Sequence, residues 1–200
     1  MRIGRITAAL ALLAASPVLA VLAGFILVGQ GRPVLFRQAR SGQHGVPFTL
    51  VKFRSMRDAR DEAGHLLPDA ERTTTIGAFL RRSRLDELPG LWNVARGEMN
   101  WIGPRPLLPE TIHDLGERGR RRCEVRPGLT GYSQISGNTL LDLDDKIALD
   151  LWYVEHRSPR LDASILARTI GVMVLGERLR HHANSAIAAG GPSASDRANS

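Results

Sequence analysis

Arg81-Arg82-Ser83-Arg84-Leu85-Asp86-Glu87-Leu88-Pro89-Gly90-Leu91-Trp92 is the stretch on which the expected fold and chemistry of this chain depend. Three arginines and a serine lead into two adjacent carboxylates, and an apolar segment follows. Pro89 is tolerated in a first helical turn, where its missing N–H has no intrahelical partner, so we expect a helix that starts near Asp86 and is capped by Ser83 or Asp86. Apolar residues then recur at helical spacing and are expected to face a core: Leu88, Leu91, Trp92 and Ala95.

The two carboxylates of this stretch are expected to have different roles. Neighbours on a helix point about 100° apart, so Asp86 and Glu87 cannot share one face. The N–H groups and the dipole at a helix start hold a carboxylate ionised, and a phosphate can share the same position. Taken alone, however, the stretch is more typical of a capped helix with a solvated acidic first turn than of a catalytic site.

Composition indicates one domain with appendages that prefers anionic partners. The chain has 200 residues, 43% of them hydrophobic, and a net charge of +7 from 27 basic and 20 acidic residues. The basic residues cluster at 32–60, 81–84 and 118–126, which favours nucleic acid, acidic lipid headgroups or phosphorylated small molecules as ligands. A single cysteine, Cys123, excludes an internal disulfide and fits a reducing compartment. The six histidines lack metal-ligand spacing, which argues against a zinc site.

An uncharged segment at 6–31 is long enough to cross a bilayer as a helix. A signal peptide is one interpretation, because Arg2 and Arg5 precede the segment, but its apolar run is longer than a typical signal sequence. A plain membrane span is the second. The third is a re-entrant hairpin that turns at Ser16-Pro17, because proline disrupts a helix and arginines flank both ends of the segment, which should keep both ends in the cytoplasm.

Beyond this segment the pattern becomes that of a soluble domain. Two short strands are expected at 33–36 and 46–53, joined by a turn at 41–45. Lys52 and Arg54 would project to the same side of the second strand, because they are two residues apart, although a solvated strand face is the simpler interpretation. The other expected elements are a polar surface loop at 58–75, helices at 76–82, 110–124, 144–155 and 161–179, and a substrate-facing loop or structural hairpin at 126–137.

Arg105 lies between two prolines, Pro104 and Pro106. The prolines fix φ on either side and restrict the backbone of Arg105 to extended conformations. A rigidly presented guanidinium suits bidentate recognition of a phosphate. An isolated Pro-Arg-Pro is also typical of a proline-rich turn with an incidental arginine.

Two of the expected helices have functional alternatives. The arginine-rich helix at 110–124 would suit nucleic acid, but it has no interleaved aromatic residues and no helix-turn-helix or zinc-finger pattern around it. The amphipathic helix at 161–179 fits either packing on the domain or a membrane interface. These features fit a membrane-tethered basic module that binds nucleic acid or anionic lipid without catalysis, which is the alternative to an enzyme.

Several motifs coincide in order and spacing with one pattern. The chain thereby resembles the bacterial sugar transferase family, the small monotopic phosphoglycosyl transferases that begin lipid-linked glycan assembly. The segments that carry the resemblance lie at 52–56, 80–89, 93–99, 103–106, 126–131 and 150–154.

The resemblance implies a reaction and a location. In that family a UDP-sugar and polyprenol phosphate give polyprenyl diphosphate-sugar and UMP with the help of Mg²⁺, in the first membrane step of exopolysaccharide, O-antigen or glycoprotein assembly. Later glycosyltransferases of the pathway are implied partners, together with membrane lipids, whereas nucleic acid is not. The apolar segment is implied to be a re-entrant helix broken at Ser16-Pro17. The catalytic domain is then expected on the cytoplasmic face of the bacterial inner membrane.

The resemblance also implies the roles of individual residues. Asp86 attacks the β-phosphorus of the UDP-sugar, carries the sugar phosphate covalently, and is the expected protein ligand of Mg²⁺ beside the substrate phosphates. Glu87 is expected to position groups or to accept a proton. Phosphoryl transfer needs positive charge around the phosphates, and the expected binding residues are Lys52, Arg54, Arg81, Pro104, Arg105, Pro106 and Arg126.

The expected fold class is therefore α+β and mainly helical. It comprises a re-entrant membrane helix at 1–31, a compact cytoplasmic catalytic domain at 32–182 with a small sheet and interfacial amphipathic helices, and a disordered tail at 183–200. The chain departs from the family pattern at Arg84, where a small or hydroxyl residue is usual, at Gly90, where glutamine is usual, and at 137–143. The changes at 137–143 lie where sugar or lipid contacts are expected, so they bear on substrate identity more than on activity.

Overall fold

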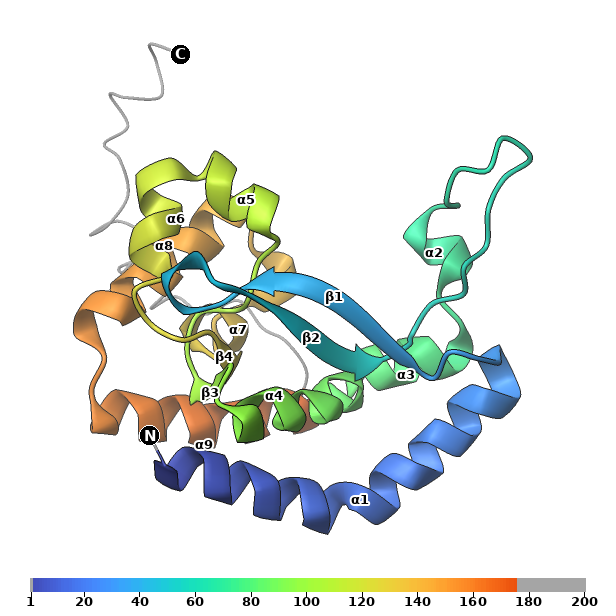
Figure 1. The fold of residues 1–200 in the computed structure, drawn as a ribbon, viewed down its shortest axis with the longest axis horizontal. Helices are drawn as coiled ribbons and strands as arrows, with labels where there is room; N and C mark the ends of the chain where they lie inside the picture. Colours follow the sequence, from blue (N-terminus) through green and yellow to red (C-terminus); the bar gives the residue numbers. More distant parts are fainter. Residues whose placement is uncertain (1, 176–200) are drawn as a thin grey trace. The chain divides into compact units, whose positions relative to one another are not determined.

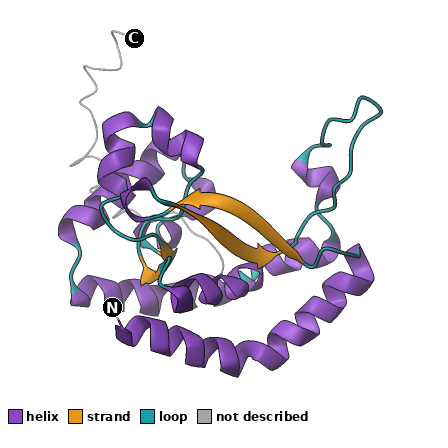
Figure 2. Ribbon diagram, in the orientation of Figure 1, coloured by secondary structure: helices purple, strands orange, loops and turns teal. Residues whose placement is uncertain are grey.

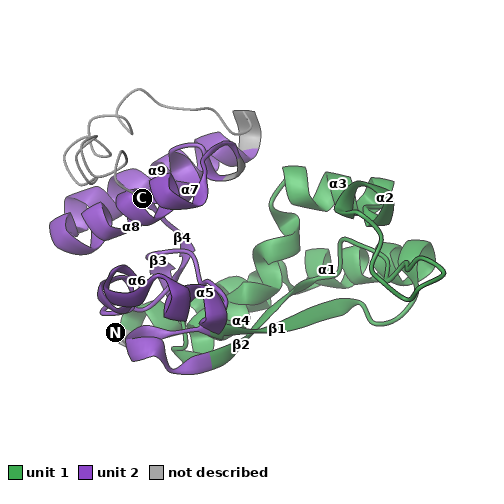
Figure 3. Ribbon diagram, turned by 90° about the horizontal axis from the view of Figure 1, so that it is seen from above, with its two compact units in different colours: residues 1–40, 48–99 green, residues 41–47, 100–200 purple. Residues whose placement is uncertain are grey.

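The computed structural model describes residues 2–175, which fall into two compact units (Figure 3). Unit 1 is built from Met1–Arg40 and Phe48–Met99, and unit 2 from Ser41–Pro47 and Asn100–Ser200. The described part is mainly helical with few strands, as the predicted fold class requires (Figure 2). The tail predicted at 183–200 lies outside the described residues, and the boundary predicted at 31 stays a prediction.

Unit 1 begins with a single long helix, α1 (Arg2–Gln30), which bends along its length (Figure 1). Pro17 lies inside it and cannot donate a hydrogen bond to the carbonyl of Leu13, four residues earlier. The hydroxyl of Ser16 donates to that same carbonyl at 2.7 Å. The helix therefore stays continuous across Ser16-Pro17, so the predicted separation into two helices is replaced by one bent helix.

Most of the apolar surface of α1 is exposed. An 18-residue window within Ile3–Gln30 has a mean hydropathy of 2.5 and only 6% of its residues are buried, and Val28 is 90% exposed. A buried core helix cannot have this pattern, since apolar surface of this extent is unfavourable in water. The helix is long and apolar enough to cross a bilayer, which indicates that the chain associates with a membrane.

The rest of unit 1 packs along α1. The strands β1 (Leu35–Ser41) and β2 (Pro47–Phe53) form a hairpin through the short 3-10 turn η1 (Gln43–Gly45), as predicted, although β1 starts and ends later than expected. Four further elements follow in the order α2 (Asp69–Arg72), α3 (Thr75–Arg82), the 3-10 helix η2 (Leu85–Gly90) and α4 (Leu91–Arg96). The helices α3, η2 and α4 contact α1, and a small core forms around Ile26, Phe53 and Leu80.

Asn93 connects α4 to the hairpin. Its side-chain Nδ2 donates to the carbonyl of Thr49 and to a carboxylate oxygen of Glu98, both at 2.7 Å, and its Oδ1 accepts the backbone N–H of Val51 at 3.1 Å. Asn93 is 1% exposed, so these bonds satisfy its buried polar atoms. The sequence instead predicted that Trp92 would face the core, but Trp92 is 51% exposed.

Unit 2 contains a parallel pair of short strands that the sequence did not predict. Strand β3 (Asn100–Ile102) pairs with β4 (Gly128–Thr130), with Asn100 opposite Gly128 and Ile102 opposite Thr130. The tip of the hairpin also belongs to this unit, because Ser41 N–H donates to the carbonyl of Leu107 at 2.9 Å. The helical elements of unit 2 are α5 (Pro109–Asp114), α6 (Gly116–Arg122), α7 (Tyr132–Ile135), η3 (Asn138–Leu140), α8 (Leu143–His156) and α9 (Pro159–Leu175).

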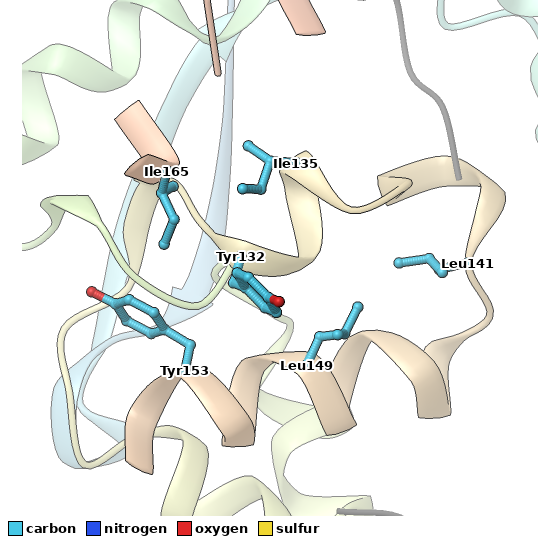
Figure 4. Packing of buried hydrophobic residues seen from close by; sticks show 6 residues of the cluster. All are labelled: Tyr132, Ile135, Leu141, Leu149, Tyr153 and Ile165. Carbon is cyan, nitrogen blue, oxygen red and sulfur yellow. The ribbon is translucent and has the colours of Figure 1, made fainter. Parts of the chain in front are cut away.

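The core of unit 2 lies between α7, α8 and α9. Figure 4 shows its buried members, which are Tyr132, Ile135, Leu141, Leu149, Tyr153 and Ile165. The predicted helices at 144–155 and 161–179 correspond to α8 and to the described part of α9. The predicted helix at 110–124 is instead two helices, because Gly116, the first residue of α6, adopts a positive φ of 54°.

Helix α9 satisfies part of each interpretation proposed for it. Ile165 is completely buried in the core, whereas Ile170 is 63% exposed and Leu166 45%. One face of α9 therefore packs on unit 2, and another presents apolar side chains to its surroundings, as an interfacial helix would.

Candidate active site

Unit 1 contains a pocket of about 470 Å³, which we call the cationic pocket. It is lined by the start of β1 and the segment before it, the end of β2, the loop after β2, and helices α2 and α3. Of the described residues that line it, six are basic and one, Asp58, is acidic. The basic residues are Arg32, Lys52, Arg54, Arg57, Arg72 and Arg81. Three predicted phosphate ligands, Lys52, Arg54 and Arg81, are thus brought together.

Helix α3 presents Arg81 to the cationic pocket. Its start is capped by the hydroxyl of Thr74, which accepts the N–H of Gly77 at 2.9 Å. Gly77 lies so close to the segment after β2 that a Cβ there would be 1.8 Å from the carbonyl oxygen of Ser55. This approach allows the Ser55 hydroxyl to accept a hydrogen bond from Arg81 Nε at 3.0 Å. Arg81 Nη2 also donates to Met56 Sδ at 3.2 Å. Two bonds to neutral acceptors therefore orient this guanidinium without neutralising its positive charge.

Arg54 and Lys52 are held differently. The guanidinium of Arg54 donates to the carbonyls of Met56 at 2.9 Å and Arg32 at 2.8 Å. Arg54 therefore fixes the two backbone segments that form the wall of the pocket, while its charge remains available at the surface of that wall. The Lys52 ammonium lies 5.2 Å from the centre of the Phe36 ring, a cation–π distance.

Arg57 and Arg72 belong to the cationic pocket but were not among the predicted ligands. Arg57 donates to the carbonyl of Gly29 at 3.3 Å. Arg72 donates to Asp69 at 2.5 Å, and its Nε is buried without a hydrogen-bond partner. The basic cluster noted at 32–60 contained the signal for Arg57, whereas Arg72 stands in a segment predicted to be only a surface loop.

Asp86 lies in η2, directly after the turn that follows α3, and is 7% exposed. Neither predicted cap is observed: Ser83 donates back to the carbonyl of Phe79 at 2.8 Å, and the residue before η2 is Arg84 in the left-handed conformation with φ of 59°. Asp86 is therefore a buried carboxylate within a 3-10 turn. Acidic side chains are rarely buried to this extent, which makes Asp86 a candidate for a chemical role.

Glu87 forms an ion pair with Arg84, one of the positions at which the chain departs from the family pattern. Its Oε2 lies 3.6 Å from Arg84 Nη1, and both side chains are largely shielded from solvent. Asp86 is thus buried, whereas Glu87 is partly shielded and forms an ion pair with Arg84. The cation two residues before Asp86 is balanced by Glu87.

The segment that follows α3 links the pocket to Asp86. Arg81 lines the cationic pocket, α3 and η2 contact each other, and Asp86 is the second residue of η2. A phosphate held by Arg81 and a carboxylate on the next turn are the two components that phosphoryl transfer to an aspartate requires.

The other predicted site residues, Pro104, Arg105, Pro106 and Arg126, belong to unit 2. Pro104 accepts the N–H of Gly128 at 2.9 Å, and both prolines are buried. Gly103 is required here, because a Cβ would be 2.5 Å from the carbonyl oxygen of Arg126. The Pro-Arg-Pro segment is therefore fixed against β4, and Arg105 is half-buried.

A buried ion pair supports this segment. Arg122 Nε and Nη2 donate to Asp150 Oδ2 at 2.8 and 2.7 Å, and Arg122 also donates to the carbonyl of Arg105. Complete burial raises the pKa of Asp150, while the guanidinium of Arg122 opposes that shift. The sequence showed Arg122 only as part of an arginine-rich helix, and its pairing with Asp150, 28 residues later, was not predicted.

The described residues, 2–175, contain no group of three or more His, Cys, Asp or Glu side chains that could hold a metal ion. Mg²⁺ characteristically uses only one or two carboxylates and completes its shell with substrate phosphates and water. A single buried carboxylate five residues after Arg81 of the cationic pocket fits that mode, and it does not fit an all-protein cage.

Comparison with known proteins shows that the chain is similar to sugar transferases. The sequence pattern of the family described as "Bacterial sugar transferase" matches residues 2–176. The chain is 42% identical over 180 residues to "Uncharacterized sugar transferase EpsL" of Bacillus subtilis, covering 90% of this chain and 89% of that protein.

Two longer relatives have names that state a reaction. One is "Undecaprenyl-phosphate glucose phosphotransferase" of Komagataeibacter xylinus, 40% identical over 80% of this chain and 33% of that protein. The other is "UDP-glucose:undecaprenyl-phosphate glucose-1-phosphate transferase" of Escherichia coli, 37% identical over 82% of this chain and 38% of that protein. The chain thus spans only about a third of the length of these two relatives.

Proposed function

Because this chain belongs to the bacterial sugar transferase family, we propose that it transfers a sugar phosphate from a UDP-sugar to polyprenol phosphate, giving polyprenyl diphosphate-sugar and UMP. The names of the Komagataeibacter and Escherichia relatives support this general reaction. The observation that carries the proposal is the buried carboxylate of Asp86 on the turn that follows Arg81, a residue of the cationic pocket.

In the first step a carboxylate oxygen of Asp86 attacks the β-phosphorus of the UDP-sugar. The bond from that phosphorus to the bridging oxygen breaks, and UMP leaves with the electron pair. The sugar phosphate remains on Asp86 as an acyl phosphate. Arg81 and Lys52 hold the negative charge of the diphosphate in the cationic pocket.

In the second step a phosphate oxygen of the polyprenol phosphate attacks the same phosphorus. The bond to Asp86 breaks and the carboxylate is restored. Glu87, anchored by Arg84, positions the incoming phosphate or accepts its proton if it arrives protonated. The product is a lipid diphosphate that later glycosyltransferases of a glycan pathway would extend.

Asp86 is the residue that would hold Mg²⁺, together with the substrate phosphates. When bound, the ion would neutralise charge on the transferred phosphoryl group. The pocket arginines act on the same charge from the protein side.

The test is the Asp86→Asn variant, assayed in detergent with Mg²⁺, polyprenol phosphate and a panel of UDP-sugars. We expect UMP release with at least one donor, and a loss of at least about a thousandfold in the variant, because the nucleophile is removed. Without the lipid, wild type should gain the mass of one sugar phosphate, and Asp86→Asn should not. Asp114→Asn, the same change at an 80% exposed side chain, is the matched control. A silent panel, or full activity in Asp86→Asn, would contradict the proposal.

We further propose that α1 enters and leaves the membrane on the cytoplasmic side of the bacterial inner membrane. Polar contacts near both of its ends support this topology, since all are made within unit 1. Arg5 Nε donates to the carbonyl of Ala95 at 3.1 Å near the start of the helix. Gln30 Nε2 donates to the carbonyl of Arg54 at 3.4 Å at its end. A helix that crossed the bilayer would have one of these ends on the opposite side.

Cysteine labelling tests the topology. Ile3→Cys and Phe36→Cys place thiols at exposed positions on either side of the apolar segment, and the native Cys123 is buried. A membrane-impermeant maleimide should label both variants in inside-out vesicles and neither in right-side-out vesicles. Labelling of the two positions from opposite sides would show a plain span and overturn the proposed re-entrant topology.

A further inference from the structure

Unit 1 contains a second pocket of about 720 Å³, which we call the apolar pocket. It lies between α1 and the β1–β2 hairpin, and η2 and α4 contribute Pro89 and Trp92 to its lining. Arg37 is the charged residue among its described lining residues. Its volume falls within the range of about 300–1,000 Å³ that is usual for pockets that bind small molecules.

Small residues on one side of α1 create the space. Ala20, Ala23 and Gly24 line the pocket. Ala23 and Gly24 follow Ala20 by three and four residues, so the three residues share one side of the helix. A Cβ built on Gly24 would meet no atom within 4 Å. Trp92 lines the same space and is 51% exposed. A large aromatic side chain at the edge of an apolar pocket is a feature of binding sites for apolar groups.

A third cavity of about 760 Å³ shares lining residues with both the apolar pocket and the cationic pocket. This cavity shares Leu27 and Arg37 with the apolar pocket, and Arg32 and Arg54 with the cationic pocket. The succession runs from apolar to strongly basic surroundings within unit 1. An amphiphile with an apolar chain and an anionic head matches this gradient.

The stretch that carries Asp86 borders both ends of the succession. Arg81 lines the cationic pocket, and Pro89 and Trp92 line the apolar pocket. Asp86 stands between them in sequence, five residues after Arg81 and three before Pro89. A lipid phosphate whose chain lay in the apolar pocket would have its head close to this stretch.

We propose that the apolar pocket binds the phosphate-proximal isoprene units of the acceptor lipid, and that Arg37 guides its phosphate toward Asp86. This inference rests on the proposed function, because it assigns a site to the second substrate of that reaction. Arg37 suits the role because it is exposed and lines both the apolar pocket and the third cavity. An isoprenoid phosphate is favoured over an ordinary phospholipid because its single chain bears the phosphate directly at one end.

The test fills the pocket and measures the two half-reactions separately. Gly24→Leu places a side chain in the open space without a contact inside 4 Å at its Cβ. Gly171→Leu on α9, where a Cβ also meets nothing within 4 Å, is the matched control. Exchange of labelled UMP into the UDP-sugar without lipid reports the donor half-reaction, and the KM for polyprenyl phosphate reports acceptor binding.

We expect Gly24→Leu to exchange UMP as wild type does and to raise the KM for polyprenyl phosphate about tenfold or more, because the lost chain contacts are worth at least this factor. Gly171→Leu should change neither value. If wild type showed no exchange, the proposed function would fail. If exchange persisted and Gly24→Leu left the KM unchanged, the pocket assignment alone would be wrong.

A photoreactive polyprenyl phosphate gives a measurement that does not depend on a variant. It should crosslink to residues 19–27 and to Trp92, and unlabelled polyprenyl phosphate should prevent this crosslinking. Equal competition by phosphatidylglycerol would show that ordinary membrane lipid fills the pocket, which would overturn the proposal.

Discussion

The cationic pocket of unit 1 and the ion pair of unit 2 place arginine in opposite surroundings. In the pocket, six basic side chains line a space with one acid, and Arg81 and Arg54 donate to a hydroxyl and to backbone carbonyls, which leave their charge uncompensated. In unit 2, Arg122 and Asp150 are 3% and 2% exposed and compensate each other. The first arrangement keeps positive charge available to an anionic ligand, whereas the second uses it to hold a backbone segment.

The cationic pocket and the buried ion pair distinguish two classes of arginine in this chain. An arginine whose hydrogen bonds go to neutral acceptors at a pocket is a candidate ligand, because such bonds orient the guanidinium without neutralising it. An arginine bonded to a buried carboxylate is a structural group, because removal of either partner leaves an unpaired charge. The two classes should respond differently to substitution.

The largest effect on stability is expected from Arg122→Met. The change leaves the Asp150 carboxylate buried without its partner, which we expect to cost about 3–5 kcal/mol in the free energy of unfolding. Because burial raises the pKa of Asp150, the carboxyl group can take up a proton in the variant, so the loss should shrink as the pH falls. Denaturant unfolding in detergent at several pH values measures both the loss of stability and its dependence on pH.

The double variant Arg122→Met/Asp150→Leu is the control for this prediction. It removes both charges, and we expect it to recover most of the lost stability. A single variant as stable as wild type would remove the distinction between the two regions. A double variant that is no more stable than the single variant would also remove this distinction.

A smaller effect, and one on activity alone, is expected from Arg81→Gln. The guanidinium contributes charge-assisted hydrogen bonds to the substrate, so kcat/KM for the UDP-sugar should fall roughly ten- to a hundredfold. Stability should change little, because the partner Ser55 is neutral. Arg120→Gln, at a side chain that is 72% exposed and paired with Glu117, is the matched control. Loss of folding in Arg81→Gln would place Arg81 in the structural class.

Local patterns in the sequence predicted the elements but not these pairings. Helix α3 and the hairpin follow from short-range spacing and turn residues, and both were confirmed. Arg122 and Asp150 are 28 residues apart, and periodicity treats such charges as solvated because it has no information on their partner. The parallel strands β3 and β4 pair across a similar separation. Trp92 was misplaced for a related reason: an aromatic side chain at helical spacing was assumed to be buried, but it lines the apolar pocket.

The candidate site was predictable in composition but not in arrangement. The basic cluster and the acidic pair are visible in the sequence, as are the roles that the family pattern implies for them. The partner of Glu87 is not visible, because the ion pair with Arg84 depends on the left-handed turn at Arg84. Arg72 enters the cationic pocket from a segment that sequence alone shows only as polar.

The smallest effect concerns Cys123, which follows Arg122 and reports on the integrity of unit 2. Burial raises the pKa of the Cys123 thiol, and the nearby Arg122 guanidinium opposes this only in part. At neutral pH the thiolate fraction is therefore lower than in a free cysteine, so a maleimide should react slowly with the folded protein and rapidly after denaturation. Arg81→Gln should leave this slow rate unchanged, whereas Arg122→Met should raise it, because unit 2 opens more often. Equal labelling rates in the two variants would show that the ion pair does not stabilise unit 2 more than the pocket arginine stabilises its surroundings.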